Sequence, residues 1–206
     1  MKSNIKVIIF DLGGVLVPEK RDFIDDHISR LLKITKNNLR KLYKNINNKL
    51  TKGEVSLGQF YSKILKKIKV EKEITSSELV QKHIELYKKC QKRNINVLRL
   101  IEKLKKKYLV VCLVNTEIEI AKINKEAGLY DIFSKSFIST DMKIMKPNLN
   151  IYKTVLRQLG VKSKEVVFID DKEKNVKAAK TLGINGILFT NVKDLKISLK
   201  RILSNF

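Results

Sequence analysis

The chain has 206 residues, of which 43% are hydrophobic and 32% are charged. This length suits one globular domain with an insertion, and the hydrophobic content excludes a disordered chain. The apolar run near the first residue is too short and wrongly flanked for a secretory signal, and no apolar stretch approaches membrane-spanning length. We therefore expect a cytoplasmic protein that does not enter a membrane.

The formal net charge of +23 would suit a protein that binds a nucleic-acid backbone. However, 37 of the 44 basic residues are Lys, they spread over nearly all expected helices, and the chain has no Trp. This distribution favours solvated helix surfaces over a nucleic-acid interface, and the positive field should attract anionic substrates. Cys90 and Cys112 lie in different segments, so we expect free thiols.

The first part of the chain predicts one strand followed by a helical module. Residues 5–10 form an apolar run typical of a strand buried on both faces of a parallel sheet. From 21 to 93 the apolar residues recur at helical spacing, and Ser76 or Ser77 is a candidate N-cap for the last helix. Four helices are expected there, near residues 23–32, 38–46, 60–68 and 77–87.

Strands and helices alternate in the remainder of the chain. The expected strands are 109–114, 137–138, 166–169 and 186–189, and the expected helices are 97–106, 119–127, 149–159, 176–182 and 195–203. Such alternation predicts an α/β fold with a doubly wound, Rossmann-like parallel sheet. Residues 1–17 and 94–206 would form this core, and residues 18–93 a helical cap inserted after the first strand.

Polar residues follow three of the expected strands, at the edge of the sheet where ligands bind in this architecture. Asp11 precedes Gly13 and Gly14, whose backbone can turn tightly and approach a bound anion. A carboxylate in this position can bind a hard cation or attack phosphorus. The alternative is that these residues only make a turn.

Asp170 and Asp171 form an acidic pair after the fourth strand. Two adjacent carboxylates repel each other unless a cation or an amine compensates them. One could bind Mg²⁺ together with Asp11, while the other orients a water ligand or the amine of Lys146. The alternative is that one of the pair is an N-cap of the next helix.

Lys146 stands out among the many lysines because Pro147 follows it and restricts its backbone. Near two carboxylate sites, its amine would neutralise charge and attract a phosphoryl oxygen. The alternative is an ordinary surface lysine.

These motifs together resemble the haloacid dehalogenase-like hydrolase superfamily. The resemblance covers nearly the whole chain, and residues 52–56 also resemble the helical cap of its phosphatase branch, which includes sugar-phosphate phosphatases and the phosphatase domain of soluble epoxide hydrolase. The motifs that carry it are Phe10-Asp11-Leu12-Gly13-Gly14-Val15-Leu16, Val114-Asn115-Thr116, Lys146-Pro147 with Ile151-Tyr152, and Phe168-Ile169-Asp170-Asp171 with Asn175-Val176, Ala178-Ala179 and Leu182-Gly183.

The resemblance implies a Mg²⁺-dependent phosphatase that hydrolyses a small phosphorylated metabolite through an aspartyl-phosphate. Asp11 would be the nucleophile and a metal ligand, and Lys146 would stabilise the nucleophile and the phosphate. The other implied metal ligands are the Gly13 carbonyl and Asp171 with Asp170 in support, and the implied substrate-binding residues are Gly13, Gly14, Asn115, Thr116 and Lys146.

Two positions depart from the family pattern. Gly13 replaces the Asp that acts as general acid and base in most phosphatases of the superfamily, and Val114 replaces a Ser or Thr that binds phosphate. Both departures favour an alternative, a weak or inactive member that binds a phosphorylated ligand or a protein partner. A 2-haloacid dehalogenase is a further alternative, but Asp170 and Asp171 speak against it because expelling halide gains nothing from extra anions.

The cap offers fewer functional signals. His27, His83 and Tyr43 could face a substrate, although their spacing is more typical of helix-face or core residues. Gly53-Glu54-Val55 is the better candidate for a loop that contacts the substrate, because Gly53 interrupts the helices.

Overall fold

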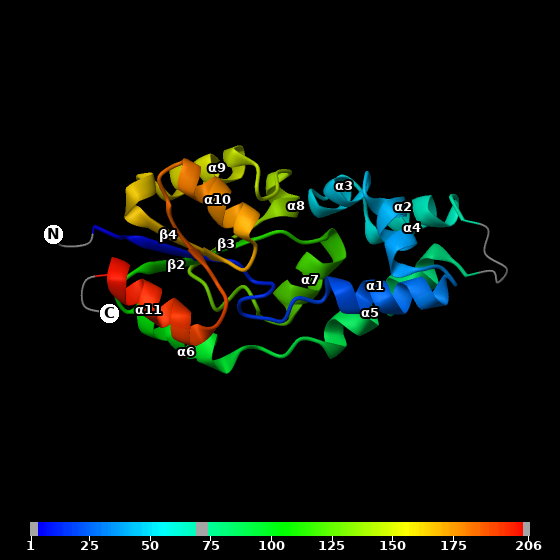
Figure 1. The fold of residues 1–206 in the computed structure, drawn as a ribbon, viewed down its shortest axis with the longest axis horizontal. Helices are drawn as coiled ribbons and strands as arrows, with labels where there is room; N and C mark the ends of the chain where they lie inside the picture. Colours follow the sequence, from blue (N-terminus) through cyan, green and yellow to red (C-terminus); the bar gives the residue numbers. More distant parts are fainter. Residues whose placement is uncertain (1–3, 69–73, 204–206) are drawn as a thin grey trace.

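The computed structural model describes residues 4–68 and 74–203. Its centre is a five-stranded parallel sheet with the strand order β3-β2-β1-β4-β5 (Figure 1). The strands are β1 (Val7–Phe10), β2 (Leu109–Val114), β3 (Lys135–Ile138), β4 (Val166–Asp170) and β5 (Asn185–Leu188). Because all strands are parallel, their carboxyl ends meet at one edge of the sheet.

Both faces of the sheet are buried, which explains the continuous apolar runs of the central strands. Ile8 and Phe10 pack against α6 (Ile95–Lys105) and α11 (Val192–Ile202), whereas Val7 and Ile9 pack against the helices of the other face. That face is covered by α9 (Leu149–Leu159) and α10 (Glu173–Thr181) (Figure 1). The predicted α/β Rossmann-like fold is confirmed.

Three short elements complete this part of the molecule. They are α7 (Ile118–Glu126), α8 (Ser139–Met142) and a 3₁₀ helix at Ser163–Glu165. α7 follows β2 and α8 follows β3, so both begin at the edge of the sheet where the strands end.

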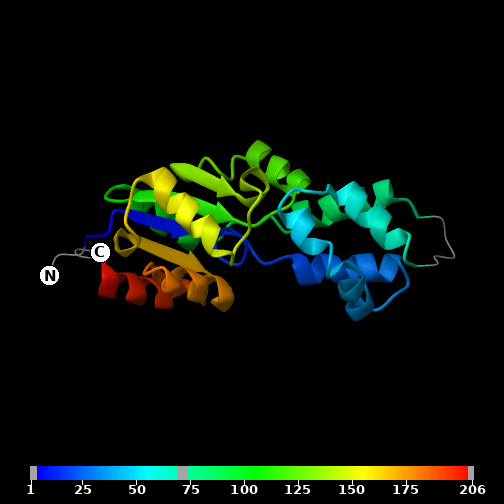
Figure 2. The same ribbon diagram turned by 90° about the horizontal axis from the view of Figure 1, so that it is seen from above.

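A helical module lies beyond that edge, as the second view shows most clearly (Figures 1 and 2). It has its own apolar cluster, which is separate from the two clusters that flank the sheet. Its elements are α1 (Arg21–Leu31), α2 (Lys36–Tyr43), α3 (Asn47–Thr51), α4 (Leu57–Leu65) and α5 (Ser76–Lys89). We call this module the cap.

The cap differs in detail from the sequence-based expectation. The short helix α3 was not expected, and Thr75 rather than Ser76 or Ser77 is the N-cap of α5, where it forms a capping box with Glu78. The chain leaves and re-enters the sheet domain at one place, where the Asn94 amide donates to the Leu16 carbonyl over 2.8 Å. The boundaries at 17/18 and 93/94 stay a prediction.

No helix in the described ranges is long and apolar enough to cross a membrane. Cys90 and Cys112 are both free thiols, as expected.

Candidate active site

Asp11 directly follows β1 and is buried at the edge of the sheet. Its amide donates to the Ile169 carbonyl of β4 over 2.8 Å, which extends the strand pairing to this residue. Its Oδ1 accepts from the Leu12 amide at 2.7 Å and from Lys146 Nζ at 2.9 Å. The carboxylate is therefore oriented by backbone and by a single amine.

Lys146 connects three strand ends, although the chain reaches it by way of a loop. Its Nζ donates to the Leu113 carbonyl at 2.6 Å and to Asp170 Oδ2 at 2.8 Å, in addition to Asp11. The three ammonium hydrogens are thus all used. Only 1% of the residue is exposed, so Lys146 is not the surface lysine of the alternative reading.

Asp170 has no exposed surface and is held by hydrogen bonds on both oxygens. Besides Lys146, it accepts from the Lys172 amide at 2.8 Å and from Asn175 Nδ2 at 2.9 and 3.0 Å. Neither aspartate of the pair is the N-cap of α10, because Lys172 occupies that position. Asp170 therefore orients Lys146.

Asp171 differs from its neighbour because its buried Oδ1 has no hydrogen-bond partner within the described residues. Carboxylate oxygens of Asp11, Asp170 and Asp171 lie within 4.8 Å of one another. Three carboxylates and the ammonium of Lys146 leave two negative charges, which a divalent cation would balance. This donor set, all oxygen and including an unsatisfied buried atom, fits Mg²⁺.

The pKa shifts of Asp11 and Asp171 agree with a cation site. Burial raises the pKa of Asp11, the positive charge of Lys146 lowers it, and the negative charge of Asp170 raises it further. Burial also raises the pKa of Asp171. A bound cation would favour the ionised form of both carboxyl groups.

The two glycines after Asp11 have different environments. Gly14 has a φ of +79°, and a Cβ at this position would overlap the carboxylate of Asp171. A Cβ at Gly13 would meet no atom within 4 Å. The positive φ and the close approach of Asp171 thus both require a glycine at position 14. At position 13 there is space for a side chain.

The loop after β2 is tied to its surroundings. Asn115 Oδ1 accepts from the Lys146 amide at 2.9 Å and its Nδ2 donates to the Lys146 carbonyl at 2.9 Å. Asn115 therefore positions Lys146, and one hydrogen of its amide group is left to donate. The Thr116 amide donates to Ser139 Oγ at 3.0 Å. Val114, at the end of β2, lines the cavity described next.

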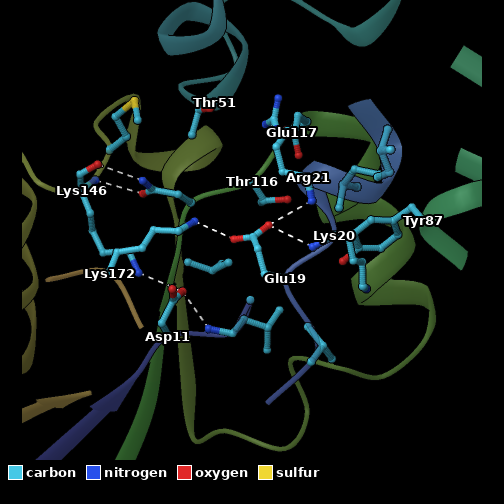
Figure 3. A pocket seen from close by; sticks show the side chains of 18 of the residues that line it. Asp11, Glu19, Lys20, Arg21, Thr51, Tyr87, Thr116, Glu117, Lys146 and Lys172 are labelled. Carbon is cyan, nitrogen blue, oxygen red and sulfur yellow. Dashed lines mark hydrogen bonds and ion pairs between the residues drawn. The ribbon is translucent and has the colours of Figure 1, made fainter. Parts of the chain in front are cut away.

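A cavity of about 300 Å³ lies between these residues and the cap (Figure 3). From the cap side it is lined by Lys20, Arg21, Ile24, Tyr43, Asn47, Thr51, His83 and Tyr87. Arg21 pairs with Glu117 at 2.6 Å, and Glu19 pairs with Lys172 at 2.8 Å. His27 and Gly53-Glu54-Val55 are not part of this lining; Gly53 instead accepts from Lys143 Nζ at 3.0 Å.

Five charged residues line the cavity without a sequence signal that marks them: Glu19, Lys20, Arg21, Glu117 and Lys172. In a chain with this many charged residues, a charged residue near the start of a helix is expected to be exposed to solvent. No sequence periodicity distinguishes such a residue from one that lines a cavity.

Comparison with known proteins places this arrangement in a family. The model of the haloacid dehalogenase-like hydrolases matches residues 5–183. A HAD family enzyme of Bacteroides thetaiotaomicron, solved as a magnesium complex, is 27% identical with a TM-score of 0.76 and covers 91% of this chain and 94% of its own. A predicted HAD-like hydrolase of Porphyromonas gingivalis shares the fold at 21% identity, with a TM-score of 0.75 over 96% of this chain and 99% of its own.

Among curated proteins, a sesquiterpene phosphatase of Aspergillus oryzae is 37% identical over 62 residues, which are 30% of this chain and 32% of that protein. A drimenol cyclase of Aspergillus calidoustus is 30% identical over 80 residues, which are 39% of this chain and 15% of that protein. The matches thus span a third or less of these curated relatives. On the family model, which covers most of its length, the chain belongs to the haloacid dehalogenase-like hydrolases.

Proposed function

We propose that this protein is a Mg²⁺-dependent phosphatase that hydrolyses a small phosphorylated metabolite through an aspartyl-phosphate on Asp11. The observation that carries the proposal is the position of Asp11, whose Oδ1 is held by Leu12 and Lys146 at the wall of the cavity. A carboxylate fixed in this way can attack phosphorus with little reorganisation.

The metal site of this proposal consists of Asp11, Asp171 and the main-chain carbonyl of Gly13. Asp170 supports them through its hydrogen bonds to Lys146 and Asn175. When bound, Mg²⁺ would supply the positive charge that lets a phosphate dianion approach three carboxylates. A HAD family enzyme of Bacteroides thetaiotaomicron, 27% identical, was solved with magnesium and inorganic phosphate, which supports this assignment.

In the first step a bond forms between an Asp11 oxygen and phosphorus while the bond from phosphorus to the leaving alcohol breaks. Lys146 stabilises the carboxylate before attack and the phosphoryl oxygens afterwards. The side-chain amide of Asn115 and the hydroxyl of Thr116 are the proposed donors to the remaining oxygens. The Gly14 amide, which the sequence also suggested, already donates to the Val17 carbonyl at 2.7 Å. Because Gly13 carries no acid, the leaving oxygen takes its proton from water.

In the second step water adds to phosphorus and releases inorganic phosphate and the Asp11 carboxylate. Phosphatase activity is supported by the relative that is a sesquiterpene phosphatase, which matches 30% of this chain. The size of the cavity, about 300 Å³, suits a small ester.

Hydrolysis of p-nitrophenyl phosphate with and without Mg²⁺ tests this proposal. We expect wild-type turnover only with the metal and background release from Asp11→Asn, which keeps the shape of the side chain but removes the nucleophile. Lack of turnover, also across a panel of sugar phosphates, would refute the phosphatase.

A second candidate, a weak or inactive protein that binds a phosphorylated ligand or a protein partner, is favoured by one observation. Gly13 and Val114 present no acid and no hydroxyl to the cavity. This candidate predicts binding of inorganic phosphate without turnover of any ester. Metal-independent release of halide from a chloroacid would instead identify a dehalogenase; the three clustered carboxylates oppose that reaction.

A further inference from the structure

Lys20 is a buried lysine at the cap end of the active-site cavity. Only 5% of the residue is exposed, and its Nζ has no hydrogen-bond partner in the described parts of the chain. The amine lies 3.8 Å from the centroid of the Tyr87 ring, and Lys20 lines the same cavity as Asp11 (Figure 3). A buried cation with these surroundings keeps three donors without an acceptor.

The neighbouring charges compensate it only in part. Arg21 is paired with Glu117 at 2.6 Å, and Glu19 is paired with Lys172 at 2.8 Å. Contact with the face of an aromatic ring offsets only part of the cost of removing an ammonium group from water. Accordingly, burial lowers the pKa of Lys20 to about 8, although nearby Cys90 and Glu19 raise it.

The backbone holds Lys20 in this position. Glu19 Oε1 accepts from the amides of Lys20 and Arg21 at 3.0 and 3.1 Å, while its Oε2 accepts from Lys172. The Lys20 carbonyl accepts from the Ile24 amide, and this is the first hydrogen bond of helix α1. Glu19 therefore connects the start of the cap to the loop that carries Asp171, and Lys20 projects from this connection into the cavity.

We propose that Lys20 forms an anion subsite that binds a second negatively charged group of the substrate, a carboxylate or a second phosphate, remote from the phosphoryl group at Asp11. The ligand provides the acceptors and the counter-charge that the protein withholds. Specificity for a doubly anionic metabolite follows, because a neutral substrate leaves the buried amine unpaired. This inference rests on the proposed function for the position of the reacting phosphoryl group.

A matched series of esters tests the subsite. The probes are alkyl phosphates with two to five carbons that end in a methyl group, a carboxylate or a second phosphate, assayed with Mg²⁺. At the best chain length, kcat/KM for one of the charged esters should exceed kcat/KM for the methyl-terminated ester by about 10- to 100-fold. This range corresponds to the free energy of a charge-assisted hydrogen bond. Comparison of the carboxylate and phosphate series identifies which anion fits.

In Lys20→Met this ratio should fall to near 1, mainly through a higher KM for the charged ester, and Lys20→Arg should retain most of it. Lys174→Met is the control, because Lys174 also lines the cavity but is exposed on α10. An unchanged ratio in Lys20→Met, or an equal loss in Lys174→Met, would overturn the subsite. Circular dichroism of the variants separates this result from misfolding.

Calorimetric titration with the corresponding alkylphosphonates, which cannot be hydrolysed at the P–C bond, separates this inference from the proposed function. Tighter binding of the charged phosphonate that is lost in Lys20→Met would support the subsite even without turnover of any ester. Turnover of the methyl ester without preference for either charged ester would refute the subsite and leave the phosphatase intact.

Discussion

Gly13 and Gly14 are adjacent, but a side chain would meet different surroundings at each. A Cβ at Gly13 meets no atom within 4 Å, and Gly13 is not among the glycines with positive φ. An acid is therefore sterically possible at the position where most phosphatases of the family carry one.

We expect Gly13→Asp to raise kcat for esters with poor leaving groups, by up to the ~10²–10⁴-fold that a general acid contributes. The gain should be smaller for p-nitrophenyl phosphate, whose leaving group needs no proton. Rates across a series of leaving groups measure the effect, with Gly13→Asn as the control. Equal rates for the Asp and Asn variants would contradict it.

At Gly14 even a methyl group should be damaging. Gly14→Ala places an L-residue at a φ of +79° and pushes its Cβ into the carboxylate of Asp171. The left-handed conformation alone costs about 1–2 kcal/mol, and displacement of Asp171 should weaken the proposed metal site. Urea denaturation with and without Mg²⁺ measures both effects, and Gly13→Ala, with open space, should show neither.

At the scale of elements, Ser139 connects three segments. It is fully buried at the start of α8; its hydroxyl donates to the Thr51 carbonyl in α3 at 2.7 Å and accepts from the Thr116 amide at 3.0 Å. This hydroxyl thereby links the cap to the loop after β2.

Removal of this hydroxyl in Ser139→Ala leaves a buried amide and a buried carbonyl unpaired, so we expect a loss of about 1–3 kcal/mol of unfolding free energy. Chemical denaturation measures the loss. Thr181→Ala is the control, because its exposed hydroxyl donates to the Ala178 carbonyl within its own helix, α10. Equal stabilities of the two variants would show that the link is unimportant.

The elements also show where sequence patterns were sufficient. The strands β2 and β4 were predicted within one residue because they are continuous apolar runs. The short helices α3 and α8 were missed, since five or fewer residues carry no helical periodicity. Thr75 was missed as an N-cap because three consecutive hydroxyl residues at 75–77 offer the same capping chemistry.

At the scale of the whole molecule, His83 makes the stability dependent on pH. The residue is buried in the cap, with Nδ1 2.8 Å from the hydroxyl of Tyr61. Burial lowers its pKa to about 4; the charge of Arg21 acts in the same direction, and those of Glu117 and Asp25 oppose it.

The unfolded chain protonates this histidine near pH 6.5, so the folded state binds fewer protons between pH 6.5 and about 4. The stabilisation is fully present above pH 6.5 and is lost as the pH falls towards 4, by roughly 3 kcal/mol. Unfolding free energies of the wild type and His83→Gln over this range isolate the effect. Parallel curves would contradict the prediction.

Metal binding should stabilise the whole molecule, since Asp171 Oδ1 is buried and has no hydrogen-bond partner among the described residues. The three carboxylates and Lys146 also leave an excess of two negative charges. At a Mg²⁺ concentration of 100 Kd we expect about 2.7 kcal/mol of additional stability. Thermal unfolding in Mg²⁺ and in chelator measures this difference. Asp171→Asn should abolish it, whereas Asp131→Asn, on the exposed surface, should retain it.

The Rossmann-like fold, the family and the group of polar residues at one edge of the sheet could all be predicted from the sequence alone. The physical reason is that parallel strands are buried on both faces and end at the same edge, so apolar runs and the residues that follow them carry the information. Asp11, Asn115, Asp170 and Asp171 could be found in this way, whereas Lys146 was marked by the proline that follows it.

Only the tertiary structure decided how these groups are paired. Lys146 forms ion pairs with Asp11 and Asp170, and Asn115 hydrogen-bonds to the backbone of Lys146. One oxygen of Asp171 has no partner in residues 4–68 and 74–203. The amine of Lys20, which has no hydrogen-bond partner in the described part of the chain, could be recognised only in the folded structure. Such contacts join residues far apart in the sequence, and their energies depend on burial and distance, which no local pattern encodes.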